Sequence, residues 1–384
     1  MVGLYLSDLG NRGQKIDAAL VGSLGAVSFA AELIGALPMG MLADIVAPRI
    51  LMAAGGVLSA AGIYMMGVTT VIPLFFLSRM LEGLGAAASV PSTLAYLTDV
   101  TEAGPKLRGR VMSYFELTLL AGIALGSPVA GKLWQVYRQG GFTGAAALYI
   151  SSGILLGFGA IALRKHTGAT SFDGLKHALR ETSIRRLAPA WVAMNAIVGL
   201  WLGPTFVFLL TRRDSHDQYL AGLFAAEPTA VGWAFLGYSI VFAIGVTTWS
   251  FVLHRMTRKN ALYIALIAML AVCVGFYALN HSQSWASAGR WTLLFGLALL
   301  VMVESGFTPA ALALLADVVG GQPGRGSAMG IYSALLGVGA LAGSLFAGVL
   351  GSRFAVDGLI FGTFALAIVA MITIRQIPAA ERNQ

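Results

Sequence analysis

The chain has 384 residues, of which 57% are hydrophobic and only 11% are charged. A soluble protein of this length cannot bury so much apolar surface, so the composition excludes an ordinary soluble fold and makes lipid the expected solvent. The formal net charge of +8 raises nucleic-acid binding as a function, but the distribution of the basic residues explains much of it otherwise. The single cysteine, Cys273, lies in an apolar run, so neither a disulfide nor a metal site is expected.

Apolar runs long enough to cross a hydrocarbon layer about 30 Å thick follow one another along the chain. In chain order, the expected spans are 18–43, 50–69, 72–98, 111–136, 143–163, 187–210, 229–253, 260–279, 291–316, 327–350 and 355–375. These eleven segments predict an all-α membrane protein. A polar, basic linker at 164–186 separates a predicted N-terminal bundle, 1–163, from a predicted C-terminal bundle, 187–384.

Charge predicts the orientation of these spans. If the turn from Asp44 to Arg49 is cytoplasmic, alternation of the spans places about twice as many Lys and Arg residues on the cytoplasmic side as on the outer side. This bias predicts a cytoplasmic C-terminus in the cell membrane, and it removes the need for a nucleic-acid partner.

The two halves carry the same small-residue pattern at one constant offset. The front set is Arg108-Gly109, Met112, Gly122, Gly126-Ser127 and Gly131, and the back set is Arg325-Gly326, Met329, Gly339, Gly343-Ser344 and Gly348. Duplicated halves are common in secondary transporters, so we expect two pseudo-symmetric bundles.

Four motifs in this order resemble the major facilitator superfamily, and within it the drug–proton antiporter branch. They are Gly40-x-Leu42-x-Asp44-x-x-x-x-Arg49, Arg79-x-x-x-Gly83, Asp99 followed by Arg108-Gly109, and Gly122-x-x-x-Gly126-x-Pro128-x-x-Gly131. The resemblance implies two six-helix-type bundles. Since only eleven full spans are found, Met1–Gly10 is interpreted as the outer end of a first helix that is mostly missing.

The resemblance also implies a function: secondary active transport by alternating access, here proton-coupled export of a small organic or drug-like solute by a monomer. A proton-coupled importer of a sugar, organic acid or other metabolite is the first alternative, and a membrane sensor or enzyme is the second. An enzyme is not expected because the five His residues are scattered. A GxxxxGK[ST] phosphate cradle is absent, so no nucleotide cofactor is expected.

Ionisable residues inside the spans are the first candidates for the solute and proton pathway, because such groups are costly in a bilayer. Glu32 falls within 18–43, where it is either a proton or cation site or a protonated acid bonded to a neighbouring helix. Glu304 falls near the middle of 291–316 and is interpreted as a substrate or proton group. Arg79 and Glu82 are three residues apart and so share a helix face. They are either part of proton coupling or a neutralised pair that orders its helix.

Two residues of the span 187–210 complete the predicted pathway. Asn195 and Trp201 lie on what the resemblance makes a wall of the cavity, although a lone Trp more often packs or sits at an interface. Gly199, Gly203 and Pro204 are expected to bend this span.

The charged motifs predict a cytoplasmic gate that closes the inner face, with a simple orientation-setting turn as the alternative reading. Its expected members are Gly40, Asp44, Arg49, Asp99, Arg108, Arg255, Arg258 and Asp317. The resemblance implies pairing of Arg49 with Asp99, and of Arg255 or Arg258 with Asp317. The remaining motif, Gly122, Gly126, Pro128 and Gly131, is interpreted as a helix-packing motif.

Overall fold

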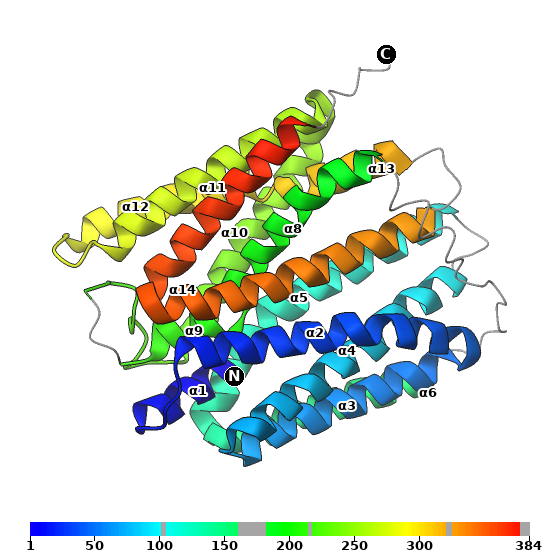
Figure 1. The fold of residues 1–384 in the computed structure, drawn as a ribbon, viewed down its shortest axis with the longest axis horizontal. Coiled ribbons are helices and arrows are strands. Elements are labelled where there is room, and N and C mark those ends of the chain that lie inside the picture. Colours follow the sequence, from blue (N-terminus) through cyan, green and yellow to red (C-terminus); the bar gives the residue numbers. More distant parts are fainter. Residues whose placement is uncertain (101–104, 160–181, 214–216, 320–324, 377–384) are drawn as a thin grey trace. The chain divides into compact units, whose positions relative to one another are not determined.

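The protein is described by a computed structural model that covers residues 1–100, 105–159, 182–213, 217–319 and 325–376. For a number of helical residues, many of them beside the gaps, only the backbone is described. Every regular element in these ranges is helical, as predicted (Figure 1).

The helices have the following bounds: α1 Val2–Asn11, α2 Ala18–Ile45, α3 Pro48–Val68, α4 Ile72–Val100, α5 Pro105–Tyr137, α6 Gly141–Gly159, α8 Thr182–Leu202, α9 Pro204–Thr211, α10 Ala230–Val252, α11 Arg258–Asn280, α12 Ser287–Glu304, α13 Phe307–Val319 and α14 Arg325–Arg375. Short 3₁₀ turns follow α5 and α10 at Arg138–Gly140 and Leu253–Arg255.

The chain forms two compact units. Unit 1 comprises Met1–Tyr5, Ser23–Thr170 and Thr229–Phe235, and unit 2 comprises Leu6–Gly22, Ser171–Pro228 and Leu236–Gln384. Helices α1, α2 and α10 therefore contribute residues to both units. The predicted linker 164–186 lies mostly outside the described residues.

In unit 1, α3 packs closely against both α4 and α6. A Cβ atom added at Gly55 would lie 2.6 Å from the carbonyl oxygen of Gly85 on α4. One added at Gly56 would lie 2.9 Å from the Cα atom of Gly153 on α6. Helices approach this closely in lipid where small residues face each other, so these glycines set the spacing of the unit.

Four aromatic side chains form a cluster in unit 1. The Tyr5 ring lies 5.4–6.0 Å from the rings of Phe75, Trp134 and Phe142. Its hydroxyl donates to the carbonyl oxygen of Thr69 at 2.7 Å and accepts a hydrogen bond from Gln139. The buried hydroxyl is therefore satisfied, as a buried polar group requires.

In unit 2, the first half of α14 packs along α8. Added Cβ atoms at Gly339 and Gly343 would collide with the backbone of α8 at Val192 and Ala196, and one at Gly199 would collide with Ala340. The back-half set of small residues found in the sequence thus mediates a close contact of two helices.

The segment Leu6–Gly22 of unit 2 packs on α14 and on the end of α9. A Cβ atom added at Gly22 would collide with Gly348, and the Ser344 hydroxyl donates to the carbonyl oxygen of Gly22 at 3.1 Å. The Arg212 guanidinium donates to the carbonyl oxygen of Ile16 at 2.5 Å. Backbone contact and polar bonds together hold the start of α2 against α14.

The helices cover most of the predicted spans, and one span contains a break that the sequence analysis did not predict. The span 291–316 is two helices, α12 and α13, separated by Ser305 and Gly306. A second break was expected and is confirmed: 187–210 divides at Gly203, where Pro204 begins α9. In α14 a single non-helical residue, Ala355, with φ 49° and ψ −129°, marks the kink between the last two predicted spans.

Eight helical stretches of the described residues are long and apolar enough to cross a membrane. They are Ala18–Ala36, Pro48–Val68, Ala121–Phe158, Arg186–Thr211, Ala230–Val252, Arg258–Asn280, Ser287–Leu314 and Ala334–Arg375. Two of these stretches, Ala121–Phe158 and Ala334–Arg375, each join two of the predicted spans, so the count of eleven spans stays a prediction.

Candidate functional site

Glu304 lies at the last residue of α12, directly before the helix break. Only 7% of the residue is exposed. Within the described part of the chain, no basic residue pairs with its carboxylate. A buried acid without a counter-charge is costly, which makes this position the strongest candidate for a group that binds a proton or a cation.

Two further polar side chains lie near Glu304 in unit 2. The carboxylate interacts electrostatically with the Tyr238 hydroxyl on α10 and the Cys273 thiol on α11. Cys273 is buried and free. The surroundings of the acid are therefore weakly polar and contain no metal-binding cluster among the residues that the structure describes.

Arg79 and Glu82 form an ion pair on α4 of unit 1, as their spacing predicts. Their side chains are 12% and 20% exposed. Arg79 Nε is buried without a hydrogen-bond partner in the described residues, and the Tyr149 hydroxyl of α6 lies within electrostatic range of both charges. The charge of Glu82 is thus compensated within its own helix.

Glu32 is half-buried on α2 in unit 1. Its helix contacts α4 next to this position: a Cβ atom added at Gly83 would collide with the Ser28 carbonyl oxygen, and one added at Gly35 would touch Ala87. Glu32 therefore lies beside a close contact between α2 and α4 of unit 1, whereas Glu304 belongs to unit 2.

Asn195 and Trp201 both lie on α8 but have different surroundings. The Asn195 amide donates to the carbonyl oxygen of Trp191 on its own helix at 2.8 Å. The Trp201 indole N–H donates to the Thr363 hydroxyl at 2.7 Å, and its ring contacts Phe206 and Phe276 edge-on. Trp201 thus contributes to an aromatic cluster of unit 2, while Asn195 is satisfied within α8.

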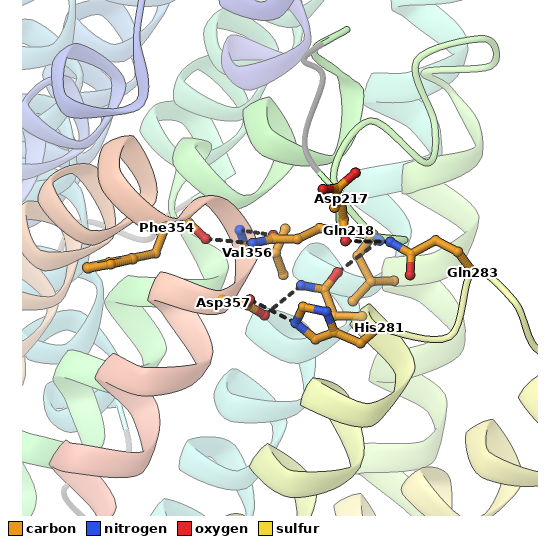
Figure 2. A network of polar contacts seen from close by, with 9 residues as sticks. Asp217, Gln218, His281, Gln283, Phe354, Val356 and Asp357 are labelled. Carbon is orange, nitrogen blue, oxygen red and sulfur yellow. Dashed lines mark hydrogen bonds and ion pairs between the residues drawn. The ribbon is translucent and has the colours of Figure 1, made fainter.

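A polar network of unit 2 ties the end of α11 to the kink in α14 (Figure 2). Asp357 accepts from the buried Asn280 amide at 2.8 Å and contacts the His281 ring nitrogen at 2.9 Å. The Gln218 side chain donates to the carbonyl oxygen of Phe354 and accepts from the Val356 N–H, so it spans the left-handed Ala355. These bonds stabilise a backbone conformation that a non-glycine residue rarely adopts.

Most of the predicted cytoplasmic gate cannot be placed. For Gly40, Asp44, Asp99, Arg108 and Asp317 the structure describes the backbone alone. Arg258 donates to the carbonyl oxygen of Leu253 at 2.9 Å, Arg255 is exposed, and Arg49 is half-buried at the start of α3. The expected pairs of this gate stay a prediction.

Among the described residues, the predicted packing motif of α5 makes a close helix contact only at its C-terminal end. Cβ atoms added at Gly131 and Gly232 would contact Thr229 and Pro128, so the C-terminal part of α5 meets the start of α10 within unit 1. Gly122 and Gly126 have no described atom within 4 Å of an added Cβ.

Sequence reasoning missed Trp249 of α10, whose indole lies against the break beside Glu304. It also missed the network of Asn280, His281 and Asp357. The Ser305-Gly306 pair is a signal that predicts a helix break, because such pairs are frequent at kinks. For Trp249 and Asp357 the sequence holds no such signal, since their partners are distant along the chain.

Comparison with known proteins adds family evidence to this geometry. The sequence profile of the Major Facilitator Superfamily matches residues 1–224 and 216–384. Multidrug resistance protein 1 of Bacillus subtilis (strain 168) is 23% identical over 372 residues, which is 94% of this chain and 87% of that protein. The uncharacterized MFS-type transporter YwfA of the same organism is 26% identical over 274 residues, covering 70% of this chain and 64% of that protein.

Solved structures share the fold at low sequence identity. A mutant of the nucleoside transporter NupG matches with a TM-score of 0.72 and 17% identity, covering 98% of this chain and 94% of that chain. A bacterial homolog of the human lysosomal transporter Spinster, solved in an inward-facing and occupied conformation, matches with a TM-score of 0.69 and 13% identity, covering 97% and 92%. The profile match extends over the whole chain, which therefore belongs to the Major Facilitator Superfamily of multi-pass membrane transporters.

Proposed function

We propose that this transporter exports a small organic or drug-like solute in exchange for protons, by alternating access. The observation that carries the proposal is Glu304, a buried acid at a break in a membrane helix that has no basic partner among the described residues. Broken membrane helices with an ionisable group are typical of ion and substrate sites in secondary transporters.

The chemistry of a lone buried carboxyl group supports this coupling. An ionised carboxylate in a medium of low dielectric constant is costly unless an opposite charge accompanies it. A proton and a solute cation are therefore alternative partners for Glu304, and binding of one favours release of the other. This competition is the simplest physical basis for exchange of a proton against a cationic solute.

The relatives support the proposal to different degrees. The name of the multidrug resistance protein of Bacillus subtilis favours export of drug-like compounds. The fold is equally that of a nucleoside transporter, so uptake of a nucleoside or another metabolite is the second candidate function. Arg79 and Glu82, Glu32, Asn195 and Trp201 are proposed as further members of the pathway, in a monomer of the cell membrane with a cytoplasmic C-terminus.

The test is transport by the purified chain in lipid vesicles. The probes are ethidium, tetraphenylphosphonium and uridine, each measured with and without an imposed pH gradient. Exchange coupling predicts that cation movement is driven by the gradient in the wild-type protein and that Glu304→Gln abolishes the gradient-driven part. Uptake of uridine without any cation transport would favour the second candidate function and overturn export.

A further inference from the structure

The break between α12 and α13 exposes backbone carbonyl groups in a region predicted to be membrane-embedded. Carbonyl groups without donors cost several kcal/mol in hydrocarbon, so a stable break needs replacement donors. The Ser305 N–H still makes the regular helical bond to the carbonyl oxygen of Val301 at 3.0 Å, and the Ser305 hydroxyl supplies a replacement donor to the carbonyl oxygen of Met302 at 2.8 Å. Both bonds come from the broken segment itself.

The carbonyl oxygen of Val303 receives a donor from another helix. The Trp249 indole N–H of α10 donates to it at 3.0 Å, alongside a longer bond of 3.3 Å from the Gly306 N–H. Trp249 is only 6% exposed. A fixed side chain thus holds the peptide group that directly precedes Glu304.

Steric contacts also hold the break between α12 and α13 in place. A Cβ atom added at Gly306 would collide with the Trp249 indole, and one added at Gly245 would collide with the Ser305 hydroxyl. Gly245 and Trp249 are four residues apart and therefore lie on one face of α10. This face of α10 packs closely on the break, because the Trp249 indole contacts Gly306 and Gly245 contacts Ser305.

We infer that Trp249 is a positioning residue for Glu304: its bond to Val303 and its packing on Gly306 hold the break in the geometry that aims the carboxyl group. The orientation of the peptide group between Val303 and Glu304 sets the direction in which the Glu304 side chain projects from the helix. Among the residues that the structure describes, Tyr238 of α10 and Cys273 of α11 are titratable groups that interact electrostatically with the carboxyl group. Displacement of the break changes the distances from the Glu304 carboxyl group to Tyr238 and Cys273.

The inference deepens the proposed function and rests on Glu304 as its titrating group, but its main test does not require transport. Infrared difference titration of the purified protein identifies the protonated Glu304 carboxyl band as the signal lost in Glu304→Gln. In Trp249→Phe an aromatic ring remains, but the indole N–H donor is lost. We expect the midpoint of the Glu304 band to move by at least about 0.5 pH units in this variant. We also expect the variant to remain folded.

Two controls separate positioning from packing. Replacement of Trp249 by benzothienylalanine removes the N–H and keeps the shape of the indole, so it should move the midpoint as Trp249→Phe does and also serves if that variant does not fold. Trp191→Phe trims another Trp of the same buried cluster but leaves the bond from Trp249 to Val303 in place, so it should leave the midpoint unchanged.

An unchanged midpoint and band frequency in both Trp249 variants would overturn the inference, as would a wild-type Glu304 band that does not titrate. Transport supplies an independent check: in the Glu304→Gln background, Trp249→Phe should not further slow the gradient-free exchange of tetraphenylphosphonium, because Trp249 acts through the acid. Persistence of gradient-driven transport in Glu304→Gln would instead refute the proposed function and leave the infrared result to decide the role of Trp249.

Discussion

The two units of this transporter hold two acids, Glu82 and Glu304, in opposite ways. In unit 1, Glu82 is neutralised by Arg79 one helical turn away, and both residues lie in the continuous helix α4. In unit 2, Glu304 has no basic partner in the described residues and lies where the helix is interrupted. A paired acid carries its counter-charge with it, whereas an unpaired acid must take a proton or a cation from elsewhere, so the comparison points to Glu304 as the exchange group.

The largest effect should come from breaking the pair in unit 1. Arg79→Ala leaves the Glu82 charge buried and uncompensated, and we expect a loss of about 3–5 kcal/mol of stability. Thermal unfolding of the purified protein in detergent measures it. The double variant Arg79→Met/Glu82→Gln should recover most of the loss. If Arg79→Ala unfolds like the wild type, the pair does not neutralise a buried charge.

The glycine contacts offer a second comparison between regions. Gly343→Ala places a methyl group against the backbone of α8 at Ala196, and we expect a loss of about 2–3 kcal/mol from overpacking. Gly296→Ala on α12, which meets no described atom within 4 Å, should change stability by less than about 0.5 kcal/mol. Equal melting temperatures for the two variants would show that the packing of α8 against α14 does not require a glycine at position 343.

The network at the kink of α14 should have a smaller effect. Asp357→Ala removes the acceptor of the buried Asn280 amide, which leaves a donor unsatisfied at a cost of about 1–2 kcal/mol. The matched variant Asp217→Ala leaves that network intact, because only the backbone carbonyl group of Asp217 is used by Gln283. Hydrogen exchange at the end of α11 reports the loosening, and unchanged protection in Asp357→Ala would contradict the role of the network.

Glu32 should give the smallest effect of the acids on gradient-driven transport. It is half-buried rather than buried, so water or lipid headgroups can solvate its charge more easily than that of Glu304. We expect Glu32→Gln to lower the initial rate of ethidium transport by no more than about 3-fold. A loss as complete as that in Glu304→Gln would reverse the ranking of the two acids.

The sequence predicted the helices and the family well, and the details of the site less well. Long apolar runs identify membrane helices with little ambiguity, and the Gly203-Pro204 break follows from local chemistry. The division of 291–316 was missed because its apolar pattern continues through Ser305 and Gly306. Its stability depends on Trp249, which is 54 residues from Val303 along the chain.

The pair Arg79–Glu82 could be predicted because its spacing is local, and the structure confirms it. Asp357 and His281 are 76 residues apart, and only the packing of α11 against α14 brings them together. Local patterns therefore predict contacts within one helix, whereas contacts between helices depend on register and crossing, which a single sequence does not encode in a readable form.

The most direct measurement separates exchange from net transport in Glu304→Gln. Glutamine retains the size and hydrogen bonding of the acid but cannot release a proton. In vesicles without a pH gradient, the variant should exchange labelled tetraphenylphosphonium for unlabelled solute more slowly than the wild type, because glutamine carries no charge to pair with the cation, and the rate should not change with pH. With a gradient, it should not accumulate the cation. Uphill accumulation by Glu304→Gln at wild-type levels would contradict the assignment of Glu304 as the group that couples proton and solute.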